Sequence, residues 1–460
     1  MKNSTVNSEH VSGGKKVIYG IAEFGISMMT SALQFFQVFF YTDVVHYDPA
    51  LVGTALLVGK LTWDAFNDPI FGWLSDRFKS RWGRRRPFML LGAIPLGLSY
   101  WLLFSVPEGL TGIKAFLVVI ATFWLFDTFH TFVSVPYFSL TPELTFDYDE
   151  RTSLTAVRKI FGVSGYLAGA VATTMVANMI MDSMQVTEKV SWSYMGAIFG
   201  VIGMLVILVT AFFIRERNLK VFEPSRMPPL KSFLQTLKNA PFRRLSLAFV
   251  LSSFSFAVIT GSFAYFMEYQ MQMADQLSFV LLALMLTLML FLYFWKWVST
   301  RINKGPSYAI GLLIASLALI AAFFFPSGPN TLIYVVAVVV GFGFSAQYIF
   351  PWSMLADVIE VDQSVTGEHR AGIYHGAWAF LQKFTNALGV ATIGWILTFF
   401  GYVANEAQTD LSRLGIRLLF SIIGSVVMIA SLPLLAWFPI TKKSHTALLE
   451  SMKKENPDRS

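Results

Sequence analysis

The sequence predicts an all-α membrane protein with twelve transmembrane helices arranged as two halves of six. Of its 460 residues, 55% are hydrophobic and only 14% are charged, whereas soluble domains carry about 25% charged residues. The apolar runs are unbroken and about 20 residues long, which suits membrane-spanning helices rather than barrel strands of about 10 residues. A faint internal repeat divides these runs into two groups.

The apolar runs place the helices in order along the chain. Because the first 14 residues are polar and a full-length span follows directly, we expect no cleavable signal peptide. The predicted spans are 17–41, 50–73, 88–106, 114–138, 157–178, 195–214, 243–267, 276–297, 307–325, 332–355, 372–400 and 412–438.

The charges of the connecting loops predict the orientation. Lys and Arg collect in every second loop, for example from Arg77 to Arg86, whereas the alternate loops carry mostly acids. Because positive loops stay cytoplasmic, both termini are predicted to be cytoplasmic, in the plasma (inner) membrane. This bias accounts for the net charge of +7 without a nucleic-acid partner. The absence of Cys excludes disulfides and thiolate metal sites.

Polar segments mark the boundaries of the predicted halves. The stretch 215–242, rich in Lys, Arg and Pro, is predicted to be a cytoplasmic linker between an N-terminal half (1–214) and a C-terminal half (243–440). Residues 441–460 form a predicted cytoplasmic tail with a short amphipathic helix. The internal repeat agrees with this division: Trp73, Ser75 and Arg77 recur 224 positions later as Trp297, Ser299 and Arg301.

Two carboxylates in the second span are the most informative residues. Asp64 and Asp68 lie four positions apart, on one face of one helix. A charged side chain at the centre of a membrane costs about 2.5–3.5 kcal/mol on insertion scales, so it usually serves a function. The repeat partners of the two acids are Leu288 and Leu292, so the fold does not require them. We therefore predict a cation site here.

An oxygen-rich shell completes the predicted cation site. With Asn67 and the Thr131 hydroxyl, the two aspartates offer the all-oxygen ligand set that Na⁺ or another hard cation prefers. The alternative is a structural pair neutralised by Lys60 and Lys383.

The other ionisable residues within the spans each allow two interpretations. Lys383 either bridges the halves to the acids or forms a buried ion pair. Arg158 either reaches the cavity or snorkels to the interface. Asp127 either contacts substrate or stabilises its helix. Glu23 is expected to pair with a cation on the cytoplasmic gate.

The basic loop SDRFKSRWGRRRP and its weaker echo STRINK are predicted to latch the cytoplasmic face, although membrane topology alone also explains them. The residues predicted for this gate are Glu23, Asp76, Arg77, Arg84, Arg85 and Arg301.

No nucleotide-binding glycine loop, dinucleotide fingerprint or metal-spaced histidine pair is present, so we expect no enzyme and no cofactor. A transporter without a nucleotide site must draw energy from an ion gradient.

Three sequence blocks resemble the glycoside, pentoside and hexuronide:cation symporter family of the major facilitator superfamily. They are WDAFNDPIFGWLSDRFKSRWGRRRP, VPYFSLTPELTFDYDERTSL and ADVIEVDQSVTGEHRAGIYHGAWAFLQK. The resemblance implies the major facilitator fold. It places Asp64, Asn67, Asp68 and Thr131 on the family's site for Na⁺, Li⁺ or H⁺, and Lys383 on its cavity lysine.

The sugar-binding carboxylates of the family do not carry over. Ser27 and Ser134 stand where family members have aspartates, and His130 stands where they have a tyrosine. A cavity with fewer acids suits an anionic solute such as a uronide. The residues expected to bind substrate are Ser27, Asp127, His130, Ser134, Arg158 and Lys383.

The sequence therefore predicts an alternating-access symporter for a sugar or sugar-derived solute, driven by Na⁺ or H⁺ and acting as a monomer in the lipid bilayer. The segment FPWSMLADVIE also resembles the animal sodium-dependent lysophosphatidylcholine symporters, so lysophospholipid symport is the first alternative. A non-transporting receptor or scramblase is the second.

Overall fold

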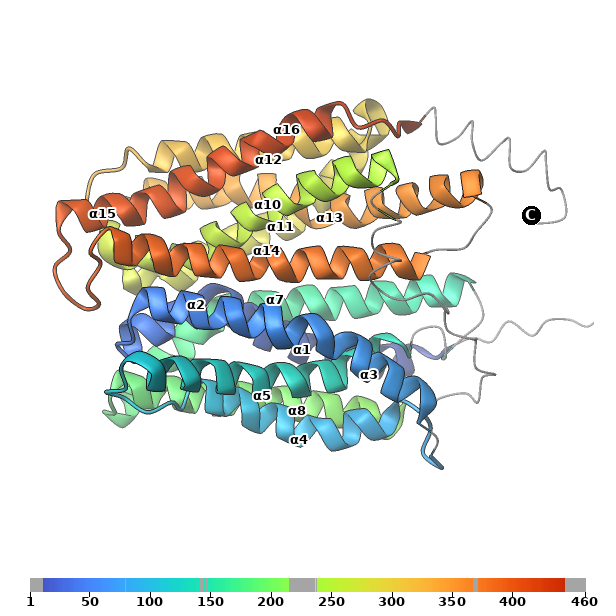
Figure 1. Ribbon diagram of the computed structural model, residues 1–460, viewed down its shortest axis with the longest axis horizontal. Coiled ribbons are helices and arrows are strands. Elements are labelled where there is room, and N and C mark those ends of the chain that lie inside the picture. The colour runs from blue at the N-terminus through green and yellow to red at the C-terminus, as the bar shows by residue number, and fades with distance from the viewer. Residues whose placement is uncertain are drawn as a thin grey trace, which may run out of the picture. The chain divides into compact units, whose positions relative to one another are not determined.

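The computed structural model describes residues 11–78, 80–140, 144, 148–214, 236, 238–366 and 371–442. These residues form helices joined by loops, and none of them lies in a strand. The chain divides into two compact units, 1–223 and 224–460, which are described separately (Figure 1). The all-helical prediction is confirmed.

The first unit packs α1 against α7 and α8, and α5 against α2, α3 and α4. Its elements are α1 (Gly13–Phe39), η1 (Phe40–Val44), α2 (Pro49–Gly59), η2 (Lys60–Asp64), α3 (Ala65–Arg77), α4 (Arg86–Leu103), α5 (Gly112–Phe138), α7 (Tyr148–Met184) and α8 (Glu188–Phe213).

The second unit packs α13 against α11 and α12, and α10 against α14 and α16. Its elements are α10 (Ala240–Tyr265), η3 (Phe266–Gln270), η4 (Ala274–Gln276), α11 (Leu277–Ile302), α12 (Lys304–Ala322), α13 (Leu332–Thr366), α14 (Ala371–Phe399), α15 (Asp410–Arg417), η5 (Leu418–Ile423) and α16 (Gly424–Ala436).

Each predicted span overlaps a helix or a run of consecutive helices in the described chain. Among these, nine helices are long and apolar enough to cross a membrane. The remaining stretches are α1, the run from α2 to α3, and α14. The run from α2 to α3 is divided into three short elements by η2. Helices α1 and α14 contain ionisable and amide side chains, including Glu23 and Lys383.

The two units share an unusual local structure where their first helices end. In each unit the helix widens into a π-turn, η1 or η3, and the next residues bond back to it with matching spacing. Val45 N donates to Phe40 O at 3.0 Å and Met271 N to Phe266 O at 3.0 Å. His46 and Gln272 then adopt positive φ angles of 63° and 53°. This shared geometry supports the internal repeat.

Glycines allow close packing between α1 and α7. A methyl group added at Gly165 would lie 2.1 Å from the Phe24 carbonyl oxygen, and one at Gly169 would lie 2.2 Å from the Met28 carbonyl oxygen. Small residues at such contacts let helix backbones approach each other, which stabilises helix pairs in membranes through van der Waals packing. This packing holds α1 and α7 side by side.

The structure differs from the predicted boundaries in three places. The span predicted at 50–73 is interrupted by η2. Helix α7 begins at Tyr148 and α13 continues to Thr366, beyond the predicted 157 and 355. Apolarity marks only the part of a helix that lies in hydrocarbon, so polar extensions escape a hydropathy argument. Most of the predicted linker and the tail from 443 on lie outside the described residues.

The α1–α7 contact predicts opposite effects of two Gly→Ala substitutions. Gly165→Ala forces the helices apart and should lower the free energy of unfolding by about 1–3 kcal/mol. Gly376→Ala in α14, where an added methyl group meets nothing within 4 Å, should be neutral or stabilise by up to about 1 kcal/mol. Thermal unfolding of both purified variants checks this, and equal midpoints would contradict the packing argument.

Candidate functional site

The π-turn η2 lies directly before the predicted cation site. It inserts an extra residue into the turn between α2 and α3, a distortion that is frequent at functional sites. Two tryptophans fasten it to α5: Trp124 Nε1 donates to Gly59 O at 3.1 Å, and Trp63 Nε1 donates to the Thr128 hydroxyl at 2.8 Å. The Lys60 ammonium lies 4.9 Å from the centre of the Phe123 ring. The turn is therefore held against α5.

Five polar residues of α3, η2 and α5 form what we call the oxygen cluster: Asp64, Asn67, Asp68, Asp127 and Thr131. The Asn67 amide donates to the Asp127 carboxylate, and the Thr131 hydroxyl donates to Asp68 Oδ1 at 3.2 Å. Asn67 is 0% exposed, Thr131 2%, Asp127 6% and Asp64 7%, whereas Asp68 is half-buried. Three carboxylates thus lie on two packed helices.

One oxygen of the cluster has no protein donor. Asn67 Oδ1 is buried and has no hydrogen-bond partner among the described residues. The bond from the Asn67 amide to Asp127 fixes this orientation of the side chain. A buried acceptor without a donor is costly unless a water molecule or a cation satisfies it. The cluster therefore contains one acceptor for which the described residues supply no donor.

The oxygen cluster offers a bound cation only oxygen ligands. These are the carboxylate, amide and hydroxyl oxygens of its side chains, which suit hard cations. Within the described chain no three residues of the types His, Cys, Asp and Glu come close enough to hold a metal ion together. The predicted cation site therefore stays a prediction.

Asp127 makes a contact that the sequence did not predict. The sequence assigned it to substrate or to its own helix, but the structure joins it to Asn67 in the oxygen cluster. Its position one turn before Thr131 was the available signal. Of its neighbours on α5, His130 is half-buried and stacks on Phe126 with ring centres 5.5 Å apart, and Ser134 is 4% exposed. Their substrate roles stay predictions.

Two other predicted substrate residues meet at the α1–α7 contact. Ser27 of α1 faces Gly162 of α7, where an added methyl group would lie 3.5 Å from its hydroxyl oxygen. One turn away, Arg158 donates to the Tyr19 hydroxyl at 3.5 Å, and its guanidinium lies 5.3 Å from the centre of the Phe138 ring. Lys383 lies half-buried on α14 in the second unit, and its coupling to the acids stays a prediction.

Part of the predicted gate in the first unit holds the fold together. Arg85 is 6% exposed and donates to the Ser75 hydroxyl at 2.5 Å. Arg86 donates to Ala211 O at 2.8 Å and to Phe212 O at 2.9 Å, at the negative end of the α8 dipole. The side chains of Arg77 and Arg84 are more exposed than that of Arg85. The side chain of Asp76 lies outside the described residues.

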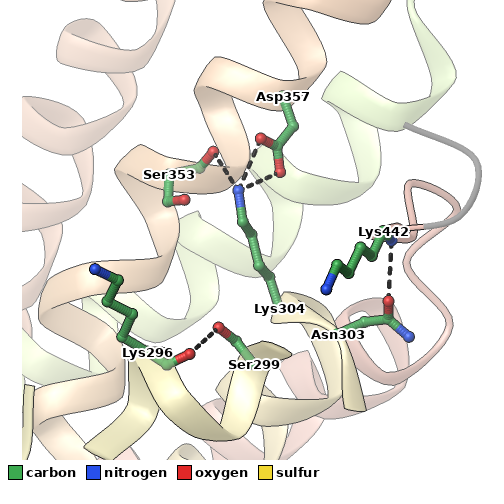
Figure 2. Close-up of polar contacts among 7 residues, drawn as sticks. All are labelled: Lys296, Ser299, Asn303, Lys304, Ser353, Asp357 and Lys442. Atoms are coloured by element: carbon green, nitrogen blue, oxygen red, sulfur yellow. Dashed lines mark hydrogen bonds and ion pairs between the residues drawn. The ribbon is translucent and has the colours of Figure 1, made fainter. Parts of the chain in front are cut away.

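In the second unit the ion pair of the echo loop involves a residue that we did not predict. Lys304 binds both carboxylate oxygens of Asp357, at 2.7 and 2.8 Å, and points toward Ser353 O (Figure 2). Arg301, the predicted gate residue, instead lies 4.6 Å from the centre of the Trp297 ring. Hydropathy could not reveal the pair because Asp357 follows the predicted end of its span at 355.

Nine helices of the described chain are long and apolar enough to cross a membrane, and the known relatives are membrane transporters rather than enzymes. The chain belongs to the MFS/sugar transport protein family, whose model matches residues 18–442. This confirms the predicted major facilitator family and an integral, multi-pass membrane protein.

Known relatives transport different solutes. An isoprimeverose transporter from Lactiplantibacillus pentosus is 29% identical and aligns with 88% of this chain and 84% of its own. The sodium-dependent lysophosphatidylcholine symporter 1-A from Danio rerio is 28% identical, with 93% and 86% aligned. The structure of a bacterial homologue of the human lysosomal transporter Spinster matches with a TM-score of 0.64 at 15% identity, covering 96% of this chain and 99% of that one. This likeness confirms the fold.

The hydrogen bond between Asn67 and Asp127 predicts a stability effect. Asn67→Ala leaves the buried Asp127 carboxylate without this donor and should lower the free energy of unfolding by about 1.5–3 kcal/mol. Thr62→Ala, on the exposed side of η2, should change it by less than about 0.5 kcal/mol. Thermal unfolding measures both, and equal midpoints for the two variants would show that the bond contributes nothing.

The Lys304–Asp357 pair predicts a rescue by charge exchange. Lys304→Asp and Asp357→Lys should each place like charges in contact and lower stability or transport, whereas the double exchange restores an opposite pair. Because the side chains are 35% and 17% exposed, the coupling energy should be about 1 kcal/mol or less. A double-mutant cycle in unfolding measures it. Strict additivity of the two single effects would rule out a direct interaction.

Proposed function

We propose that this protein is a cation-coupled symporter that carries a sugar or sugar-derived solute by alternating access. The oxygen cluster is the observation that carries the proposal, because two packed helices hold buried carboxylates beside an acceptor that lacks a donor. The cation-coupled relatives support a coupling ion. We propose Na⁺ or H⁺ for it, with both termini cytoplasmic, in the plasma (inner) membrane and acting as a monomer.

Cation binding can drive transport through charge neutralisation. Asp64 and Asp68 repel each other when both are ionised, and a bound cation removes this repulsion. A cation shifts a conformational equilibrium only by the difference between its affinities for the two states. Thr131 donates to Asp68, so the occupancy of the site can affect the position of α5.

Helix α5 is suited to couple ion and solute. It supplies Asp127 and Thr131 to the oxygen cluster and, on neighbouring turns, carries His130 and Ser134, which we propose bind substrate. A rigid helix that contributes to both sites transmits a displacement from one to the other. We propose that Ser27 and Arg158 of the first unit and Lys383 of the second unit also bind substrate.

The charge of the substrate residues favours an anionic solute. Arg158 and Lys383 are cations, whereas Ser27 and Ser134 stand at positions where sugar-binding relatives have carboxylates. Arginine forms strong charge-assisted hydrogen bonds to carboxylates. We therefore favour a uronide or another acidic glycoside over a neutral galactoside.

Lysophospholipid symport is the second candidate. The sodium-dependent lysophosphatidylcholine symporter is 28% identical to this chain, only one percentage point below the sugar transporter. A lysophospholipid also carries an anionic phosphate. A receptor or scramblase, in contrast, has no need for the oxygen cluster.

The cation site predicts a Na⁺-dependent gain in thermal stability. A ligand that binds only the folded state at 100 times its Kd adds about 2.7 kcal/mol. Purified wild type should be stabilised by Na⁺, or by lower pH if H⁺ is the coupling ion, and Asp64→Asn and Asp68→Asn should lose this response. Asp43→Asn removes a buried carboxylate outside the cluster and should keep it. A full Na⁺ response in both cluster variants would refute the site.

The solute class can be tested in the same assay. Glucuronides, neutral glycosides and lysophosphatidylcholine are added with and without the stabilising cation. We expect one class to raise the unfolding midpoint further in the presence of the cation, because binding of cation and solute is reciprocal. Stabilisation by lysophosphatidylcholine alone would replace the sugar proposal by the lipid one.

A further inference from the structure

Glu23 is a buried carboxylate outside the oxygen cluster. It lies on α1, is 8% exposed, and its Oε2 has no hydrogen-bond partner among the described residues. Its side chain packs on α7, where a methyl group added at Gly162 would lie 2.8 Å from Glu23 Cγ and 3.5 Å from Oε1. The missing side chain of Gly162 makes room for this carboxylate.

The groups around Glu23 come from its own helix, α1, and from α7, α5 and α8. Helix α7 supplies the cations Arg158 and Lys159, whose fields act on the carboxylate. Helix α5 supplies Tyr137, whose hydroxyl donates to Tyr19 O at 2.9 Å on the same helix as Glu23. From α8, Gly203 and Val206 lie against Gly25, and Thr210 donates to Ile18 O at 2.6 Å. None of these α8 residues is charged.

Two opposing effects act on this carboxylate. Burial favours its neutral form, and the two cations favour its ionised form. Among the described residues no hydrogen bond to Oε2 fixes the ionised form. Because these two effects oppose each other, Glu23 can change its charge when α1 or α7 moves.

The burial of Oε2 limits what can bind there. The atom has essentially no accessible surface, so neither a solute hydroxyl nor a hydrated metal ion reaches it in this conformation. A proton needs almost no volume of its own, so it is the ligand that such an oxygen can hold.

We infer that Glu23 is a proton-binding site, separate from the oxygen cluster, that controls the charge balance around Arg158. When Glu23 is ionised, it offsets the positive charge of Arg158. When a proton binds and Glu23 becomes neutral, Arg158 can attract an anionic group of the solute more strongly. The proton site stands on the geometry alone, and its use in solute binding rests on the proposed function.

Infrared difference spectroscopy of the purified full-length protein tests the proton site without any solute. Among the carboxylic acid bands that a change of pH produces in wild type, one component should be lost in Glu23→Gln and shifted in frequency in Glu23→Asp. The band should be retained in Asp43→Asn, which removes a buried carboxylate that already accepts from Thr42 at 2.5 Å. It should also be retained in Asp64→Asn, which separates this site from the oxygen cluster.

The link to Arg158 has its own readout. In Arg158→Gln the band should persist to higher pH, because a cation that favours the ionised carboxylate is gone. An unchanged midpoint would overturn the link to Arg158. Carboxylic acid bands that are identical in wild type and Glu23→Gln at every pH would overturn the proton site. If Glu23→Gln does not fold, the frequency shift in Glu23→Asp decides the assignment. The thermal-stability response of Asp64→Asn to Na⁺ tests the proposed symport and not the proton site at Glu23.

Discussion

The hydrogen bond from Asn67 to Asp127 joins the two helices on which the site depends. In a medium of low polarity each buried carboxylate and amide must find a partner or lower its charge. Asn67 uses its amide hydrogens on Asp127, which leaves its oxygen without a donor. We propose that a cation satisfies this oxygen and that its binding also relieves the repulsion between Asp64 and Asp68.

The two units share their architecture but not their charges. Both first helices end in a π-turn followed by a residue at positive φ, which shows that the local fold repeats. At the repeat positions of the two aspartates, the second unit has Leu288, which is 4% exposed, and Leu292. At these positions the second unit packs hydrophobic leucine side chains, whereas the first unit has carboxylates instead. The acids are thus a costly departure from the repeat, which is expected of functional residues rather than structural ones.

Most of the fold could be predicted from the sequence because hydrocarbon selects long apolar helices. The predicted spans all overlap helices, and the acid pair stands out by its cost. Contacts between helices could not be predicted in the same way. Nothing in the chain between Asn67 and Asp127 indicates that these residues meet, and the π-turn at Lys60–Asp64 leaves no mark on hydropathy. The Lys304–Asp357 pair was missed because polar helix ends lie beyond the apolar signal.

Helix α5 connects the oxygen cluster with the surroundings of Glu23. Near its middle, Asp127 and Thr131 bind residues of α3, and near its end the Tyr137 hydroxyl binds the Tyr19 carbonyl on α1. A displacement of α5 therefore also moves the contact one turn from Glu23. Close glycine contacts hold α1 and α7 together, so these two helices resist separation when α5 moves. Helix α5 is thus the path by which we propose that the cation site and the proton site affect each other, and any such coupling must act with the same free energy in both directions.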